Sequence, residues 1–522
     1  MASARNKEVS LPANVSVFRE LVIEGSTVFR ESDFEQVVQS VFQPKDGQAP
    51  TTEKEISDRL VSGVTQLYLS RGYITSLAEV DPGASTKEAL QIRVTEGQLV
   101  RITVENLRRL NSAYICRRIQ LGTGTPLNVT QLEEQLKLLR VDPLLENIEA
   151  SLRASPERNP GESVLIVRVK EATAFTAGFG ADNYSPPSVG SERIGVELRY
   201  RNLMGIGDEV AGSYYRSTTG GADTFDFSYL VSLNPMNGTL QLRAAPNRNE
   251  VTQPPFNELG IRGKQQVYEI TYRQPFLRSP REELALALGF TYQNGQTFLF
   301  DQLPTPFGIG PDENGVSRTS VLRFGQDYTR RDTQGIWSFR SQFNFGTGLF
   351  NATTNDAPIP DGHFFSWYGQ AQRIQKLGEN NLLLIQVNLQ LTPDSLLPSQ
   401  QFVIGGGQSV RGYRQNVRSG DNGIQFVIEN RFTVYRDESG STIQLAPFFN
   451  LGKVWNQADN PNKLPDQTFL VGGGLGLLWE QAMGIQGLSL RLDYGVPFIQ
   501  LVDRGKNAQD QGFYFSVRYQ TK

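Results

Sequence analysis

Cysteine and histidine are almost absent from this chain of 522 residues, which contains one of each, Cys116 and His363. One cysteine makes no intramolecular disulfide and no thiolate metal site, and a single histidine gives neither a metal cluster nor a proton shuttle. Cys116 falls in a predicted amphipathic helix, where a buried and inert thiol is expected. His363 precedes a predicted strand, in a loop that favours a structural or solvated side chain. The sequence therefore predicts no metal site and no cofactor.

Long hydrophobic runs are also missing. Hydrophobic residues make up 38% of the chain, and no run is long enough for a membrane-spanning helix. A membrane protein is not excluded, because the strands of a transmembrane barrel carry their apolar residues at alternating positions. The first residues contain no apolar targeting core, so no signal peptide is visible. An exported protein would then be present here in mature or trimmed form.

Motifs for nucleotide binding and for hydrolysis are absent as well. The sequence has no Gly-x-x-x-x-Gly-Lys-Ser/Thr motif and no Gly-x-Ser-x-Gly elbow, and one histidine offers no nucleophile–base pair. We therefore expect that the chain is not an enzyme. A net charge of −3, from 51 basic and 54 acidic residues, argues against a nucleic-acid partner.

Two copies of one small mixed unit are predicted in the first third of the chain, after an N-terminal extension of residues 1–15. The first copy, 16–97, has predicted strands at Phe18–Ile23, Tyr73–Ala78 and Ala89–Thr95, a helix capped by Ser32, and a helix at Glu53–Arg71 that ends at Gly72. The second copy, 98–172, has predicted strands at Val100–Glu105, Ile148–Ala154 and Val164–Val169, a helix at Tyr114–Gln120 capped by Ser112, and a helix at Val129–Arg140. The closing strands match each other, since Arg93-Val94-Thr95-Glu96 is followed 75 residues later by Arg168-Val169-Lys170-Glu171. Two tandem βααββ units are therefore predicted.

From about Thr173 the helical period gives way to a period of two. In Arg193–Arg201 the charged residues share one face of the predicted strand, and the apolar residues share the other. This pattern is typical of a lipid-facing wall around a polar lumen, although a soluble sandwich would bury the same apolar face in a core. The sequence also contains 50 glycines, 18 tyrosines and 30 phenylalanines, as turns and aromatic girdles require.

Connection lengths decide between these two folds. Sixteen strands are predicted, starting near Thr173, Glu192, Asp208, Thr224, Thr239, Gln265, Glu283, Ser317, Gly335, His363, Asn381, Gly423, Ile443, Thr468, Leu488 and Gly512. The connections after even-numbered strands are short and those after odd-numbered strands are usually longer, which is the pattern of outer-membrane barrels. An even number of strands closes an all-antiparallel sheet without an unpaired edge in lipid. We predict α+β front units followed by an all-β, 16-stranded antiparallel transmembrane barrel over residues 173–522.

The loop at 393–422 is the most informative part of this predicted barrel. Three successive glycines, 405–407, allow positive φ angles and close packing, and they are followed by Val410, Arg411, Gly412 and Tyr413. If the loop folds into the lumen, the Arg411 guanidinium needs anionic or carbonyl partners, because an unpaired buried charge is strongly destabilising. The alternation places Glu429 on the inner face of the next strand, and Phe448, Asn450 and Gly452 on the inner face of the strand after it. The alternative is that these polar groups only line a water-filled interior.

The segment Val410-Arg411-Gly412-Tyr413 resembles the lumenal loop motif of the polypeptide-transporting outer-membrane barrels. The two front units resemble polypeptide-transport-associated (POTRA) domains, and the segments 138–145 and 160–165 are similar to the second such domain of two-partner-secretion transporters. Asp182-Asn183-Tyr184 and the turn at 202–208 also resemble that branch. The chain thus resembles the TpsB-type two-partner-secretion transporters, the ShlB/FhaC/HecB group.

The resemblance implies specific partners for Arg411. In the family the loop arginine pairs with an acidic residue on the following strand and with the aspartate of a Phe-x-Asp-x-Gly motif. Glu429 matches the first position, and Phe448, Asn450 and Gly452 match the second, with asparagine in place of aspartate. Asn450 accepts a hydrogen bond but supplies no charge, so Glu429 is expected to carry the ionic part, together with Asp493.

The resemblance also implies a function, a location and partners. It implies that the chain secretes an unfolded exoprotein of the haemolysin or adhesin type, whose N-terminal secretion domain is recognised by the POTRA units. The barrel would lie in the outer membrane, in contact with lipid or lipopolysaccharide, with the POTRA units in the periplasm and the chain as a monomer. An exposed sheet edge in these units offers unpaired backbone groups to an extended client; the alternative is that the units only space the barrel from a partner. Three alternative functions are a membrane-protein insertase of the same superfamily, an outer-membrane hydrolase and a plain porin. Of these, the porin would not need the front units.

Overall fold

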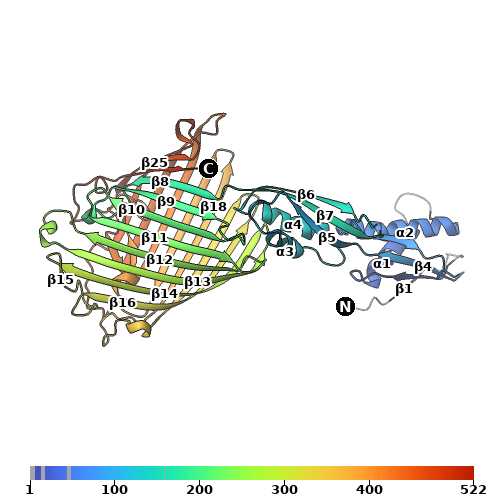
Figure 1. Cartoon of the computed structure of the whole chain (residues 1–522), viewed down its shortest axis with the longest axis horizontal. Coiled ribbons are helices and arrows are strands. Elements are labelled where there is room, and N and C mark those ends of the chain that lie inside the picture. The colour runs from blue at the N-terminus through green and yellow to red at the C-terminus, as the bar shows by residue number, and fades with distance from the viewer. Residues whose placement is uncertain (1–5, 13–17, 44–48, 87, 158, 522) are drawn as a thin grey trace. The chain divides into compact units, whose positions relative to one another are not determined.

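The chain folds into two compact units, Met1–Ala172 and Thr173–Lys522. The computed structural model describes residues 6–12, 18–43, 49–86, 88–157 and 159–521, so the predicted extension at 1–15 lies partly outside the described residues. The first unit contains two mixed sheets with helices, and the second is a closed barrel of strands (Figure 1).

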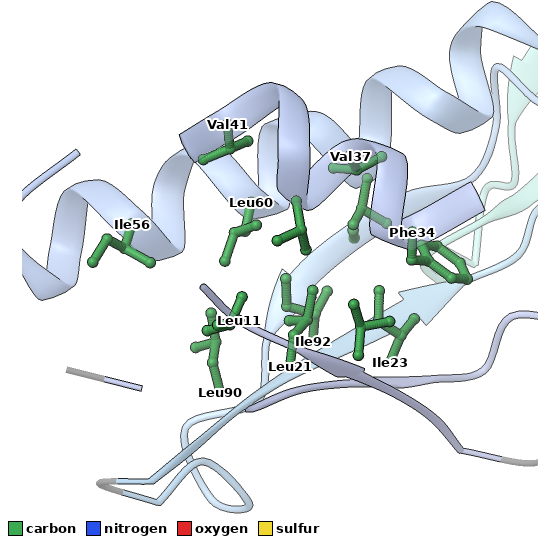
Figure 2. Packing of buried hydrophobic residues seen from close by; sticks show 14 of the residues in the cluster. Leu11, Leu21, Ile23, Phe34, Val37, Val41, Ile56, Leu60, Leu90 and Ile92 are labelled. Carbon is green, nitrogen blue, oxygen red and sulfur yellow. The ribbon is translucent and has the colours of Figure 1, made fainter. Parts of the chain in front are cut away.

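The first half of the front unit is a four-stranded sheet covered by two helices. Its strands are β1 (Lys7–Ser10), β2 (Glu20–Glu24), β3 (Leu77–Val80) and β4 (Ala89–Thr95), in the order β1-β2-β4-β3 with β2 and β4 parallel. The helices are α1 (Glu31–Phe42) and α2 (Glu53–Ser70). Figure 2 shows Leu21 and Ile23 of β2 and Ile92 of β4 facing α1 and α2. Burial of each such side chain contributes about 1.5–3 kcal/mol to folding.

Local details of this half differ from the sequence-based expectations. The predicted cap Ser32 is wrong: α1 begins at Glu31 with Arg30 as its N-cap, because the Asp33 carboxylate accepts a hydrogen bond of 2.8 Å from the Arg30 N–H. The strand predicted at Tyr73–Ala78 begins at Leu77, because residues 74–75 form a turn. Strand β1 was not predicted. Gly72 has φ +87°, as expected for a residue that ends α2 in the left-handed conformation.

The second half repeats this order without a counterpart of β1. It contains β5 (Gln98–Glu105), α3 (Ser112–Gln120), α4 (Val129–Arg140), β6 (Leu145–Ala154) and β7 (Glu162–Glu171), with sheet order β5-β7-β6. Asn111, and not Ser112, caps α3, because its side chain accepts the Ala113 N–H at 2.9 Å. Cys116 of α3 is a partly buried free thiol, and burial raises the pKa of that thiol, which makes it less reactive.

Glu96 and Glu171, the equivalent acids at the ends of the last strands β4 and β7, bind equivalent loops in the two halves. The Glu96 carboxylate accepts hydrogen bonds from the Thr27 N–H (2.8 Å) and hydroxyl (2.5 Å), in the loop after β2. The Glu171 carboxylate accepts three successive backbone N–H groups, of Arg108 (2.7 Å), Arg109 (2.9 Å) and Leu110 (3.0 Å), in the loop after β5. A repeated residue thus has a repeated structural role.

Glu171→Gln is expected to destabilise the front unit at neutral pH. Burial raises the pKa of Glu171, but the three N–H donors and Arg109 lower that pKa more, so the net shift is downward. Because the folded pKa lies below the unfolded one, the stabilisation is present above the unfolded pKa and is lost as the pH falls through the folded pKa. We expect a loss of about 1–3 kcal/mol in the free energy of unfolding of residues 1–172 at pH 7, measured by urea titration, and no difference in strong acid. The exposed Glu149→Gln on β6 is the control, and an equal loss in both variants would contradict the role of Glu171.

The second unit is a closed antiparallel barrel, which confirms the predicted fold class. Its strands are β8 (Phe175–Asp182), β9 (Arg193–Arg201), β10 (Glu209–Ser217), β11 (Ala222–Ser232), β12 (Thr239–Glu250), β13 (Arg262–Arg278), β14 (Glu282–Leu299), β16 (Val316–Arg331), β17 (Gly335–Thr347), β18 (Phe365–Gly378), β19 (Asn381–Leu391), β22 (Asn422–Arg436), β23 (Thr442–Trp455), β24 (Phe469–Glu480), β25 (Leu488–Pro497) and β26 (Phe513–Gln520). A two-residue strand, β15 (Leu303–Pro304), pairs only with the tip of β14. Pairing of β26 with β8, from Ser516↔Asp182 to Gln520↔Gly178, closes the ring. Figure 1 shows the tilted strands β8 to β16 side by side.

Side chains alternate between the two faces of the wall. On β9, Ile194 and Leu198 are 61% and 46% exposed on the outside, whereas Glu197 accepts a hydrogen bond from the Tyr215 hydroxyl. The outward apolar band is what lipid requires. Among the described residues, no helix combines the length and apolarity that a membrane span needs.

Candidate functional site

The connection between β19 and β22 lies inside the barrel. Within it, β20 (Phe402–Ile404) and β21 (Arg418–Gly420) form a small hairpin. Val410 and Ile404, both 0% exposed, pack with Val454 of β23 and Leu470 of β24. Val454 lies on the same face of β23 as Asn450, and Leu470 lies on the same face of β24 as Gly472. The opposite face of these strands is the outer one, where Phe449 and Phe469 are exposed. The loop therefore contacts the inner face of the wall.

Arg411 is buried against three strands of this wall. Its Nη1 donates to Glu429 Oε2 of β22 at 2.7 Å and to Asp493 Oδ1 of β25 at 3.4 Å. Its Nε donates to Asn450 Oδ1 of β23 at 3.0 Å. The Arg411 guanidinium carbon lies 3.4 Å from the centre of the Phe448 ring, a cation–π contact. Arg411 is 3% exposed, so water supplies little of its solvation.

Two further arginines complete the charge cluster. Arg491 of β25 donates to Glu429 (2.8 Å) and to Asp493 (2.7 and 3.0 Å), and Arg431 of β22 donates to Glu429 (2.7 Å). Three guanidinium groups thus share two carboxylates, with Asn450 as a neutral acceptor. The cluster carries one net positive charge, and the asparagine at position 450 is the reason.

Glycines let the backbone of the loop lie directly on the wall. A Cβ on Gly472 would lie 2.0 Å from the Arg411 carbonyl oxygen, and a Cβ on Gly495 would lie 2.7 Å from the Gly412 nitrogen. A Cβ on Gly452 would lie 3.0 Å from Val410 Cγ2. Side chains at these positions would push the loop away from the wall.

Tyr514 of β26 fixes the loop tip from the other side. Its hydroxyl accepts the Gly412 N–H at 2.8 Å and donates to the Tyr413 carbonyl at 2.6 Å. The Tyr413 hydroxyl in turn donates to the carbonyls of Val471 (2.8 Å) and Ile499 (3.0 Å). The whole Val410–Tyr413 motif is therefore held by buried hydrogen bonds and packing.

The stem of the loop reaches a different part of the wall. The Gln400 amide nitrogen donates to Gln293 of β14 (3.2 Å) and to Thr319 of β16 (3.1 Å). Since the tip contacts β22, β23, β25 and β26, the connection crosses the lumen between distant strands. Asp421 holds the stem to the next loop, because its buried carboxylate accepts the Leu396 and Gln457 N–H groups at 2.9 and 3.0 Å.

The structure brings together all the candidate residues: Val410, Arg411, Gly412, Tyr413, Glu429, Phe448, Asn450, Gly452 and Asp493. Sequence analysis missed Arg491, Tyr514, Gly472 and Gly495. Arg491 could have been found, because it lies two positions from Asp493 on the same face of one strand. In the part of the chain that the structure describes, no group of three metal-binding side chains occurs, and the exposed His363 has its Nδ1 3.4 Å from Asp361 Oδ2.

Comparison with known proteins assigns this chain to a family. A family model described as "Haemolysin secretion/activation protein ShlB/FhaC/HecB" matches residues 161–478, and a "POTRA domain, ShlB-type" model matches residues 17–97. The chain belongs to the ShlB/FhaC/HecB family. It is a TpsB-type outer-membrane transporter whose POTRA units lie in the periplasm.

Individual relatives are distant. The outer membrane transporter CdiB of Dickeya dadantii is 23% identical over 375 residues, covering 70% of this chain and 64% of its own length. The heme/hemopexin transporter protein HuxB of Haemophilus influenzae is 20% identical over 474 residues, covering 89% of this chain and 81% of its own length. The solved structure of CdiB from Escherichia coli aligns with a TM-score of 0.75 at 19% identity, covering 100% of this chain and 91% of that one. The chain thus spans less than two thirds of the Dickeya protein, and the structural likeness shows the fold.

Proposed function

We propose that this transporter exports an unfolded partner exoprotein, of the haemolysin or adhesin type, through the lumen of its barrel. The observation that carries the proposal is the loop at 393–422, which crosses the lumen and is held there by noncovalent contacts alone among its described residues. A plug made of a hydrogen-bonded loop is removable without unfolding the wall. A plain porin has no need of periplasmic units.

Export would begin in the periplasm. The POTRA units would bind an N-terminal secretion domain of the exoprotein in extended form, and the chain would then pass the Arg411 cluster as the loop undocks. No nucleotide site is expected, so folding of the exoprotein outside would supply the energy. The transporter would then act without enzymatic chemistry.

We propose that the transporter acts as a monomer; in support, the described strands of the barrel close into a ring and leave no edge to pair with a second copy. Its outer apolar band would contact outer-membrane lipid or lipopolysaccharide. The alternative of a membrane-protein insertase is not favoured, since the family model that matches most of the barrel describes secretion proteins.

Co-expression with the exoprotein encoded beside the transporter tests the proposal. We expect the exoprotein in the culture medium only when the transporter is present, and no change in the assembly of other barrel proteins when the transporter is deleted. Release is measured by immunoblotting of medium and cell fractions, and assembly by heat-modifiability on gels. Loss of barrel assembly without loss of release would favour the insertase.

A further inference from the structure

The two halves of the front unit differ at one sheet edge. Strand β1 pairs with β2 in antiparallel orientation, with Val9 opposite Leu21 and Lys7 opposite Ile23. In the second half, β5 pairs only with β7, so its other edge has no partner strand among the described residues. An unpaired edge presents a row of free N–H and C=O groups.

Strands β2 and β5 are equivalent residue by residue. Strand β2 runs parallel to β4, and β5 runs parallel to β7, the last strand of each half. The pairs in the first half are Ile23↔Ile92 and Glu24↔Arg93, and those at the same positions in the second half are Val104↔Val167 and Glu105↔Arg168. The acid–arginine pairs confirm the match, because Glu24 lies 3.6 Å from Arg93 and Glu105 lies 3.1 Å from Arg168. Leu21 and Ile23 therefore correspond to Ile102 and Val104.

These corresponding apolar residues differ in burial. Leu21 and Ile23 are 0% exposed, and Val9 and Leu11 of the N-terminal segment are buried with them. Ile102 and Val104 pack against the second core but remain partly exposed. Among the described residues, the β5 edge thus has no counterpart of β1, the strand that covers the equivalent edge of β2 in the first half.

We infer that the β5 edge binds an extended segment of the exported partner, in antiparallel orientation, as β1 binds β2. This inference rests on the proposed export function and names its first contact. The bound segment would have an apolar residue opposite Ile102, as Val9 is opposite Leu21, and an aliphatic residue two positions earlier, opposite Val104. A β-bulge between Leu99 and Arg101 interrupts the edge at its start, which limits the pairing to Arg101–Glu105.

The opposite edge, β6, carries one partly exposed apolar residue of this kind, Leu152, which lies opposite Leu165. Ile148 of β6 is 3% exposed without any covering strand, and the corresponding strand β3 also lies at an edge of its sheet. Thr103 and Ser151 are both exposed and both lie opposite Ile166, one on each side of β7. They provide matched positions for a test that distinguishes the two edges.

The experiment is disulfide cross-linking of the full-length protein in detergent micelles, in a Cys116→Ser background. The probe is a synthetic eight-residue peptide with valine at alternating positions and one cysteine between two valines, so that the thiol lies on the face of Thr103. We expect Thr103→Cys to cross-link about tenfold faster than Ser151→Cys, because strand hydrogen bonds and two apolar contacts hold the peptide at one edge. Val22→Cys, which β1 covers, should react as slowly as Ser151→Cys, and deletion of residues 1–10 should make it react rapidly.

Equal rates at Thr103→Cys and Ser151→Cys would overturn the inference. A peptide with serine in place of valine should lose the preference for Thr103→Cys, and an undiminished rate would show that the apolar contacts do not matter. Export of the exoprotein is measured separately, so that failure of the β5 site can be distinguished from failure of the proposed export function. Export with no edge preference refutes only the β5 site, and an edge preference in a protein that exports nothing refutes only the proposed function.

Discussion

Arg411→Ala is expected to leave the barrel folded in the outer membrane and to reduce export by about tenfold or more, because the loop loses its anchor in the lumen. Loss of a buried charge pair weakens the free energy of loop docking by several kcal/mol. The wall should tolerate the change, because Glu429 and Asp493 keep Arg431 and Arg491 as ionic partners. The loop, in contrast, loses two carboxylate contacts, the Asn450 contact and the Phe448 stacking at once. Export is measured as released exoprotein at matched membrane levels, and folding as heat-modifiability of the barrel.

Variants of the partners of Arg411 should rank by charge. Glu429→Gln should be at least as severe, because three guanidinium groups would then share one carboxylate. Asn450→Ala should be milder, since it removes one neutral acceptor of the Arg411 Nε. Asn450→Asp should neutralise the cluster, tighten the loop and lower open-channel conductance. A silent Glu429→Gln beside an inactive Asn450→Ala would show that the charged partner is misassigned, and normal export by Arg411→Ala would show that the loop is not anchored there.

The barrel could be predicted because its strands obey a simple physical rule. Each of the sixteen predicted starts lies within three residues of the observed strand, including those at Thr239, Gly335 and Asn381. Lipid on one side and water on the other force a period of two, and strand polarity forces short and long connections to alternate. The same alternation placed Glu429 and Asn450 on the inner face, where the structure has them.

Features that depend on contacts distant in the sequence could not be predicted. Nothing near Gly472 or Gly495 indicates that the loop backbone lies against them, because that contact depends on how the loop docks. Strand β1 is four residues long, too short for its alternation to indicate a strand, and its position is fixed by the neighbouring edge of β2. The missed cap at Asn111 shows the same limit, since Asn111 and the adjacent Ser112 can both accept a free N–H group at the helix start. At α1 the Arg30 N–H instead donates to the Asp33 carboxylate at 2.8 Å.

Gly472→Ala is expected to open the channel, whereas Gly473→Ala on the same strand is not. The new methyl group at 472 would meet the Arg411 carbonyl oxygen at 2.0 Å, a backbone atom of the docked loop. At 473, on the outer face, it would meet the end of the Phe498 side chain at 2.9 Å, and that side chain can move into lipid. Overpacking costs about 1–3 kcal/mol, which corresponds to an increase of about 5- to 150-fold in the undocked population. Planar-bilayer recordings measure the open fraction of each variant.

Both variants should insert equally, because both glycines lie within β24 and neither has a positive φ. Equal open fractions in Gly472→Ala and Gly473→Ala would mean that the loop does not rest on the wall at Gly472. A rise in Gly472→Ala alone would show that docking of the Arg411 backbone, beyond the charge cluster, keeps the lumen closed.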